Sequence, residues 1–331
     1  MDFHLNFDPP KLTDKIQLRD KLFLTGSCFT EHITRKLSEN KFSVFENPHG
    51  ILFNPVSICR SLYDCIEKKI YSSDDLFEDQ GLWASWNFHS RFSDADPNIA
   101  LNRINDSVNA GHDTLRSASW LIITLGSAFV YQRSDNNIVA NCHKVPAKEF
   151  KKKLLSVDEV LTEMDMLFYQ LSVFNPAIKI IFTISPVRHI KDGLIENNRS
   201  KSVLIQAVHH VVEKYDRLFY FPAYELVIDD LRDYRFFAED MVHPNYQATN
   251  YVWEKFVNAC IHESSREIMK ELFQLNAAIN HKAQHPGSVA HRNFLKKQLD
   301  ITYQLAARCP YLDFSNEIKY FTGDSSKEIA V

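Results

Sequence analysis

The stretch KLFLTGSCFTEHITRKL, residues 21–37, combines the signals of a strand, a tight turn and a helix. Its first five residues are mostly apolar, which is typical of a short buried strand. Apolar side chains then recur at every fourth position across residues 29–37, which predicts one face of a helix. Gly26, Ser27 and Cys28 are therefore expected to form the turn between strand and helix. That turn carries two candidate nucleophiles side by side.

The alternation of apolar strands with amphipathic helices continues to about residue 245. Strands are predicted at residues 21–25, 42–46, 119–125, 175–185 and 217–221. Helices are predicted at residues 54–70, 96–118, 147–154, 156–173 and 197–216, with a surface hairpin over residues 128–143. This order argues for an α/β domain in which helices cover both faces of a parallel sheet.

The C-terminal part of the chain has a different pattern, because only helices are predicted after residue 245. We expect a main domain over residues 1–264 and a helical extension over residues 265–331. The extension either packs on the main domain or mediates oligomerisation. Its apolar stripe is Ile268, Leu272 and Leu275.

Composition excludes several classes of function. The 331 residues carry a formal net charge of −4 and no dense basic stripe, so no nucleic-acid partner is expected. No apolar run reaches the length of a membrane span. The N-terminus lacks the pattern of a secretory signal, and the six cysteines are scattered, so we expect reduced thiols and a cytoplasmic location. Glycine is scarce, with 8 residues where an average chain of this length has roughly 23.

Four segments follow predicted strands and are expected at one edge of the sheet, where ligands bind in open parallel sheets. They are GSCF (26–29), GSAF (126–129), SPVRHIKDG (185–193) and FFAEDMVHPN (236–245). In the last segment, Asp240 precedes His243 by three residues, so its carboxylate can hold one ring nitrogen while the other serves as a base. The alternative is that both residues cap the following helix.

Together these segments resemble the GSCFA family of bacterial proteins, which is grouped with the SGNH (GDSL-like) hydrolases. The resemblance covers roughly residues 20–260. It implies a flavodoxin-like three-layer α/β/α domain that hydrolyses or transfers an acyl ester without a cofactor. It places Cys28 at the nucleophile position, with Ser27 as the spacer, and assigns Asp240 and His243 to the late D-x-x-H motif.

The resemblance also implies an oxyanion hole formed by Gly126 and the amide of Cys28. The chain departs from the pattern at Ala128, where an asparagine normally supplies a further donor, and losing such a donor costs about 10²–10³ in rate. Asn54, His89 and Asn197 are candidates to replace it, and the sequence does not choose among them.

A basic segment is expected on the same sheet edge. Its members are Arg188, His189, Lys191, Arg199 and Lys201. Arg188 and His189, with Asn54 and His89, are the candidate substrate-binding residues. The basic segment either holds an anionic group of the substrate or is a solvated loop and helix start. No ligand spacing typical of metal sites is present, so no metal is expected.

For each candidate nucleophile, a purely structural role is the alternative to a catalytic one. Cys28 at a helix N-terminus is expected to have a lowered pKa and to act as a nucleophile, but most free cysteines are small packing residues. Ser27 is either a nucleophile or the N-cap of the helix. We favour Cys28.

Three functions stay open. The leading one is an esterase or deacetylase-like hydrolase acting on a small-molecule or carbohydrate-linked ester. The second is an acyltransferase that passes the same covalent intermediate to a sugar hydroxyl. The third is a non-catalytic binding module, which Ala128 favours, whereas the Asp240–His243 motif favours the two enzymes.

Overall fold

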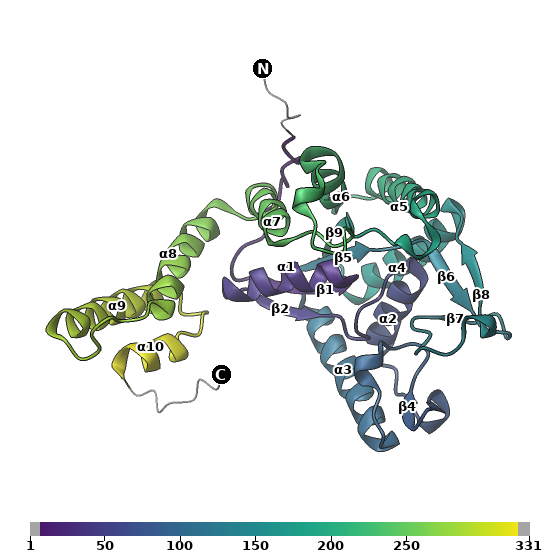
Figure 1. Cartoon of the computed structure of the whole chain (residues 1–331), viewed down its shortest axis with the longest axis horizontal. Helices are drawn as coiled ribbons and strands as arrows, with labels where there is room; N and C mark the ends of the chain where they lie inside the picture. The colour runs from purple at the N-terminus through teal and green to yellow at the C-terminus, as the bar shows by residue number, and fades with distance from the viewer. Residues whose placement is uncertain (1–6, 324–331) are drawn as a thin grey trace.

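The computed structural model of the chain describes residues 7–323 and contains a central five-stranded parallel sheet (Figure 1). The order across this sheet is β2, β1, β5, β9, β10. The strands are β1 (Lys21–Gly26), β2 (Ser43–Glu46), β5 (Trp120–Leu125), β9 (Lys179–Ile184) and β10 (Leu218–Tyr220). In the order in which these five strands follow along the chain this is 2-1-3-4-5, the flavodoxin-like arrangement. The predicted fold class is confirmed.

Successive residues of a strand point to opposite faces of the sheet. Each face therefore carries apolar side chains, and helices cover both faces. Along β1, Phe23 faces one core while Leu22 and Leu24 face the other. The first core is formed with α2 (Pro55–Glu67), α3 (Pro97–Ser117), α4 (Val157–Phe174) and α5 (Leu194–Lys214). The second is formed with α1 (Cys28–Glu39), α6 (Ala223–Glu225), the π-helical η5 (Leu226–Leu231) and α7 (Tyr246–Cys260).

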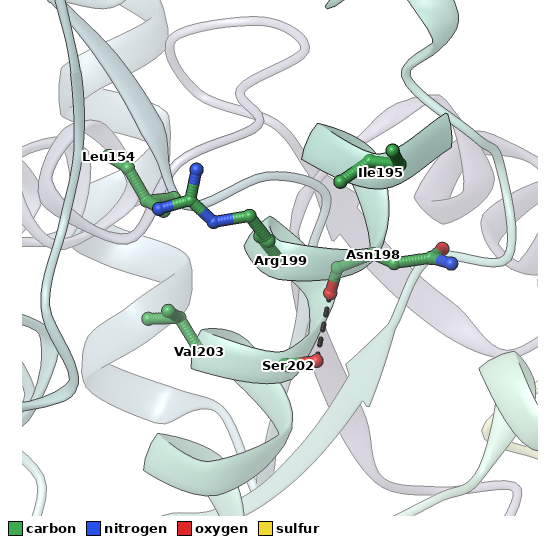
Figure 2. Close-up of a pocket in the computed structure, with 6 residues that line it drawn as sticks. All are labelled: Leu154, Ile195, Asn198, Arg199, Ser202 and Val203. Carbon is green, nitrogen blue, oxygen red and sulfur yellow. Dashed lines mark hydrogen bonds between the residues drawn. The ribbon is translucent and has the colours of Figure 1, made fainter. Parts of the chain in front are cut away.

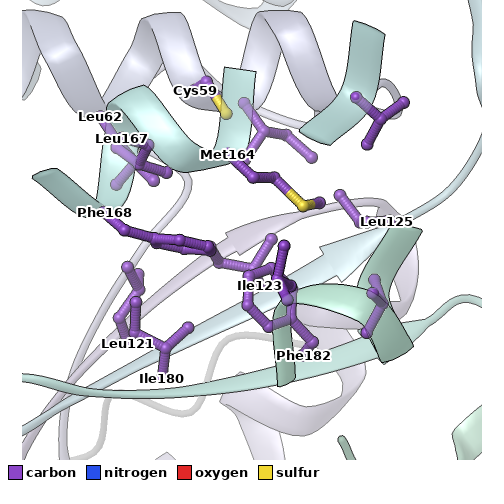
Figure 3. Packing of buried hydrophobic residues seen from close by; sticks show 14 of the residues in the cluster. Cys59, Leu62, Leu121, Ile123, Leu125, Met164, Leu167, Phe168, Ile180 and Phe182 are labelled. Atoms are coloured by element: carbon purple, nitrogen blue, oxygen red, sulfur yellow. The ribbon is translucent and has the colours of Figure 1, made fainter. Parts of the chain in front are cut away.

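Packing in the first core is dense and apolar. Figure 3 shows Met164 and Phe168 of α4 lying between the helical layer and the sheet residues Ile123 and Phe182. The aromatic rings of Phe168 and Phe182 meet edge to face with their centres 5.9 Å apart. This interlayer packing holds the carboxyl ends of β5 and β9 in fixed positions.

Short elements lie between the main strands and, in one case, after the last of them. They are η1 (Ser73–Asp75), β3 (Phe77–Asp79), β4 (Leu82–Ala84), η2 (Ser90–Phe92), β6 (Phe129–Gln132), β7 (Ile138–Val139), η3 (Ala147–Glu149), β8 (Lys151–Leu154), η4 (Ile190–Asp192) and η6 (Tyr234–Phe236). The hairpin predicted over residues 128–143 is confirmed by the pairing of β6 with β7.

The helix predicted over residues 147–154 is wrong. One 3₁₀ turn is followed by β8, which pairs antiparallel with the other edge of β6. Lys152 of β8 packs on the neighbouring strand instead of forming part of a polar helix face: its ammonium lies 4.0 Å from the ring centre of Phe129 in β6. Cross-strand contacts of this kind are not visible in local periodicity.

The C-terminal extension consists of helices, and residues 263–323 contribute no strand. It contains α8 (Glu263–Asn280), α9 (Val289–Arg308) and α10 (Ser315–Thr322), which project from the α/β domain in Figure 1. Leu272 and Leu275 are each 1% exposed and pack in a small core of their own. Residues 324–331 of the predicted extension lie outside the described residues. Across residues 7–323 no helix is both long and apolar enough to cross a membrane.

Candidate active site

The turn between β1 and α1 is held tightly against β5. Gly26 has φ +140, and a Cβ atom there would lie 2.1 Å from the carbonyl oxygen of Thr124, so only glycine fits. The amide of Gly26 donates to Oδ1 of Asn47 at 2.9 Å, and the amide of Ser27 donates to the Thr124 carbonyl at 3.1 Å. This packing fixes where α1 begins and therefore where Cys28 stands.

Cys28 is the first residue of α1 and is partly exposed at the carboxyl edge of the sheet. The amide groups of Phe29 and of Cys28 itself favour its thiolate, as expected at a helix N-terminus. Burial outweighs them, however, and together with the nearby Glu31 carboxylate it raises the pKa of the Cys28 thiol. The predicted lowering of this pKa is therefore wrong, and the thiol is protonated at neutral pH.

Ser27 occupies the N-cap position of α1 but does not cap it. Its side chain makes no capping hydrogen bond, and its Oγ atom is buried without a partner within residues 7–323. The residue is 1% exposed. Of the two candidate nucleophiles, only Cys28 presents its side chain to the edge of the sheet.

The mid-chain turn GSAF has few free amide donors. The amides of Gly126 and Ser127 both donate to the carbonyl of Phe53, at 2.8 and 2.9 Å. The amide of Ala128 donates to Oγ of Ser200 at 2.7 Å. In this structure Gly126 is thus not free to serve as the predicted oxyanion donor. The amide of Cys28, in contrast, donates to no backbone carbonyl within residues 7–323.

The late motif forms the predicted pair. Nδ1 of His243 lies 2.6 Å from Oδ2 of Asp240, which confirms that the aspartate approaches one ring nitrogen. Met241 between them has φ +59, and this left-handed turn brings the carboxylate back toward the chain. Oδ1 of Asp240 accepts the amides of Val242 and His243, both at 2.9 Å. These bonds lower the pKa of Asp240 to about 2.

The pair lies near the helix that carries Cys28. The pKa of His32 is lowered by burial, by Arg35 and by the charge of His243, so His243 is within electrostatic reach of His32. His32 follows Cys28 by four residues in α1, and residues at that spacing share a face of a helix. Within residues 7–323 the His243 ring makes no hydrogen bond to the Cys28 sulfur, and their direct contact stays a prediction.

Lys201 is a site residue whose role the sequence did not reveal. It comes from α5, is 1% exposed, and its Nζ donates to the carbonyl oxygens of Gly126 at 2.7 Å and Ser185 at 2.6 Å. These carbonyls follow two adjacent strands, β5 and β9, so the amine lies at the same sheet edge as Cys28. Burial lowers the pKa of Lys201 to about 7, while the charge of Cys28 acts in the opposite direction. In sequence, Lys201 was one of five basic residues, and only its burial distinguishes it.

The remaining predicted residues are mostly engaged in local structure. Asn54 caps α2 by accepting the amide of Ser57 at 2.8 Å, and the buried Asn197 accepts the amide of His189 at 2.9 Å. His89 accepts the amide of Arg91 at 3.3 Å. The ring of His189 lies 3.7 Å from the Asp192 carboxylate.

Arg188 has a different environment. Its guanidinium lies 5.2 Å from the ring centre of Phe237 and 5.8 Å from that of Tyr234. It lines a small hollow of about 60 Å³ with Phe237 and Tyr234, beside the segment that continues to Asp240 and His243. Arg188 therefore links two of the four segments predicted to meet at this edge.

A larger and more open hollow, of about 530 Å³, lies elsewhere (Figure 2). Figure 2 shows the Arg199 side chain extending across it toward Leu154, with Ser202 bonded to the carbonyl of Asn198. It lies on the outer face of α5 and includes neither Cys28 nor the Asp240–His243 pair. Within residues 7–323 no cluster of three His, Cys, Asp or Glu side chains could hold a metal ion.

Comparison with known proteins identifies a family. A family model described as GSCFA family matches residues 21–256, and one described as GSCFA domain protein, C-terminal domain, matches residues 273–323. No curated protein sequence matches the chain.

Several solved structures are similar at low identity. A mutant acetyl esterase with acetate ion is 9% identical with a TM-score of 0.36, covering 76% of this chain and 99% of its own. A carbohydrate esterase family 3 from Talaromyces cellulolyticus is 8% identical with a TM-score of 0.35, over 76% and 99%. An acetyl xylan esterase from the rumen bacterium Butyrivibrio proteoclasticus is 10% identical with a TM-score of 0.34, over 78% and 64%.

Proposed function

The chain belongs to the GSCFA family, and we propose that it is an acyl-ester hydrolase whose nucleophile is the thiol of Cys28. One observation carries the proposal. A partly exposed thiol stands at the N-terminus of α1, and His243 of the hydrogen-bonded Asp240–His243 pair acts electrostatically on His32 of the same helix. A nucleophile, an acid–base group and a carboxylate that orients that group are the parts that acyl transfer requires.

The proposed reaction has two steps. The Cys28 sulfur gives its proton to His243 and attacks the acyl carbon, and the oxyanion accepts a hydrogen bond from the amide of Cys28. The ester C–O bond breaks, His243 gives a proton to the leaving alkoxide, and a thioester forms on the sulfur. His243 then takes a proton from water, which attacks the thioester and regenerates the thiol.

Asp240 supports these steps by fixing the histidine. Its carboxylate accepts from Nδ1, so Nε2 is the ring nitrogen that exchanges protons. The substrate we propose is a small-molecule or carbohydrate-linked ester. Arg188 would bind an anionic group of that substrate, because its guanidinium lines the hollow next to the catalytic segment.

The experiment is turnover of an activated ester, p-nitrophenyl acetate, by the wild type and two variants. We expect Cys28→Ala to abolish turnover and Ser27→Ala to retain most of it, since the Ser27 hydroxyl is buried. An inactive Ser27→Ala beside an active Cys28→Ala would transfer the role to the serine. Circular dichroism of each variant shows whether the fold is kept.

A second candidate, a non-catalytic binding module, is favoured by one observation. The amides of Gly126, Ser127 and Ala128 are all occupied, which leaves the mid-chain turn without an oxyanion donor. This candidate predicts that the wild type turns over no ester yet binds a carboxylate product, such as acetate, in a way that Arg188→Ala weakens. Turnover that depends on Cys28 rules it out.

A further inference from the structure

We propose that Arg188 and Arg232 together bind a carboxylate group of the substrate, an inference that rests on the proposed ester hydrolysis. The substrates are then esters that carry a negative charge. Both arginines line the same hollow of about 60 Å³. Arg188 follows β9 at the carboxyl edge of the sheet, and Arg232 directly follows η5, so two separate segments each contribute one guanidinium.

The charge of the two arginines is uncompensated. Within residues 7–323 neither guanidinium forms an ion pair or a side-chain hydrogen bond. The carboxylate that lines the hollow belongs to Asp233, and it is engaged elsewhere: Oδ1 accepts the amide of Arg235 at 2.8 Å, and Oδ2 lies 3.7 Å from its Nε. Two cations that share a small space repel each other, so an anion between them is favoured.

The walls of the hollow fit a short carbon chain that ends in a carboxylate. Val227 and Ile228 of η5 and the ring of Phe237 form its apolar sides. The Arg188 guanidinium lies 5.2 Å from the ring centre of Phe237 and 5.8 Å from that of Tyr234, and these rings help to hold it in place. One water needs about 10–15 Å³, so the hollow accepts a group of a few heavy atoms. A planar carboxylate matches the paired N–H groups of arginine.

An unusual backbone places Arg232 on the hollow. The preceding η5 is a π-helix, and the amide of Arg232 donates to the carbonyl of Val227 at 3.3 Å. Arg232 itself has φ +44, in the left-handed region that is uncommon for residues other than glycine. π-Helical turns and left-handed backbone are both frequent at functional sites. The backbone at this position therefore supports a functional role for the second arginine.

The hollow lies beside the catalytic pair. Phe237, which lines it, pairs antiparallel with Pro244, and the amide of Ala238 donates to the carbonyl of His243 at 2.7 Å. His243 is therefore adjacent to one wall of the hollow, whereas Cys28 is not among the residues that line it. The bound carboxylate thus belongs to a part of the substrate remote from the reacting carbonyl. Binding of such a remote group helps to orient the ester for reaction.

The first test determines whether a carboxylate contacts both arginines in the wild-type protein. Phenylglyoxal modifies arginine side chains, and peptide mass spectrometry gives the rate at each residue. We expect butyrate at ten times its dissociation constant to slow modification of Arg188 and Arg232 by about tenfold, because few sites then stay free. Butyramide and sodium chloride should not. Arg199 is the internal control, since it lines the larger hollow and is paired with Glu196 at 2.9 Å.

Three results overturn the proposal. The first is equal protection by butyrate and butyramide, and the second is protection of Arg199 as strong as that of Arg188 and Arg232. The third is protection of only one of the two proposed arginines, because the site would then not be shared. Inorganic phosphate that protects both at a lower concentration than butyrate overturns the assignment to a carboxylate.

The second test measures kcat/KM for pairs of esters that differ only in a terminal carboxylate or carboxamide. The mono-p-nitrophenyl esters of adipic acid and of its monoamide carry this group on the acyl half. The pair ω-acetoxyhexanoate and ω-acetoxyhexanamide carries it on the alcohol half. We expect the wild type to prefer the charged member of one pair by about tenfold or more, as for one charge-assisted hydrogen bond, and that pair identifies the charged half.

Variants connect this preference to the two arginines. Arg188→Gln and Arg232→Gln should each bring the ratio of kcat/KM for acid over amide toward one, mainly through KM, whereas Arg199→Gln should keep the wild-type ratio. A wild-type ratio near one for both pairs, or a preference that Arg188→Gln and Arg232→Gln both retain, overturns the proposal.

These outcomes separate the inference from the proposed function. If butyrate protects both arginines but the wild type hydrolyses no ester, the carboxylate subsite stands and the hydrolase proposal fails. If ester turnover requires Cys28 while butyrate protects neither arginine and acid and amide react equally, the hydrolase proposal stands and the subsite fails.

Discussion

Asp240 holds His243 at two places, accepting from the ring Nδ1 at 2.6 Å and from the backbone amide at 2.9 Å. A single carboxylate therefore fixes both the position of the residue and the orientation of its ring. Because these bonds lower the pKa of Asp240 to about 2, the carboxylate stays ionised throughout the range in which an ester hydrolase is assayed.

Replacing the carboxylate by an amide tests the importance of this orientation. Asp240→Asn can present an N–H to Nδ1, which would place the ring proton on Nε2 and remove the basic nitrogen. We expect kcat to fall by about 10²–10⁴, the usual contribution of a general acid–base group, with the fold unchanged. Asp135→Asn, an exposed aspartate that also accepts a backbone amide, is the control and should keep full activity. Near-normal activity of Asp240→Asn would contradict this role.

The pH dependence of stability reports on Lys201. Its folded-state pKa, about 7, lies below the 10.5 of the unfolded chain, so between these values the unfolded state binds more protons. Stability should therefore rise with pH across this window, and the gain should be lost as the pH falls back toward 7. The expected gain in unfolding free energy from pH 7 to pH 9 is on the order of 2 kcal/mol.

Urea unfolding at both pH values checks this, with Lys201→Met as the comparison. The methionine does not titrate, so the variant should lack that rise in unfolding free energy. If the unfolding free energy changes equally with pH in the two proteins, Lys201 is charged in the folded state, because all other titrating groups are common to both.

The turn that places Cys28 should tolerate no side chain at Gly26. In Gly26→Ala the new Cβ meets the Thr124 carbonyl at 2.1 Å, and the expected loss of unfolding free energy is about 3 kcal/mol or more. Gly287→Ala is the control, because Gly287 also has a positive φ (+79) but open space around its Cβ position. We expect it to cost only about 1 kcal/mol. Equal midpoints of urea unfolding for the two variants would show that the clash is relieved elsewhere.

Truncations test how the extension is joined to the α/β domain. Helix α8 starts inside that domain, where Oγ of Ser265 accepts the amide of Leu18 at 2.9 Å, and continues into the separate core of Leu272 and Leu275. A chain ending after Lys270 keeps the first contact and exposes neither leucine, so it should stay soluble and active. A chain ending after His281 leaves both leucines without α9 and α10 and should aggregate. The reverse order of solubility, measured by sedimentation, would contradict this division of α8.

Local features of the site could be predicted from the sequence. The strand, turn and helix around Gly26 follow from periodicity within a few residues, and the Asp240–His243 bond spans three residues. Both are properties of contiguous sequence, so they could be predicted without knowledge of the packing.

Features that depend on burial could not be predicted. The pKa of Cys28 was expected to fall because its helix position is visible in sequence, whereas the desolvation that raises it depends on distant segments. Lys201 looked like one basic residue among several until α5 was seen to bury it between the ends of β5 and β9. The strand Lys151–Leu154 was missed because its pairing partner, β6, is about twenty residues away.

The central claim is that Cys28 forms a covalent acyl intermediate, and trapping that intermediate tests it most directly. The enzyme is mixed with p-nitrophenyl acetate, quenched in acid within the first turnover and analysed by fragment-resolved mass spectrometry. The account predicts one acetyl group on Cys28, removed by hydroxylamine at neutral pH as expected for a thioester, and none in Cys28→Ala. An acetyl group on Ser27 that resists neutral hydroxylamine, or undiminished labelling of that segment in Cys28→Ala, would contradict it.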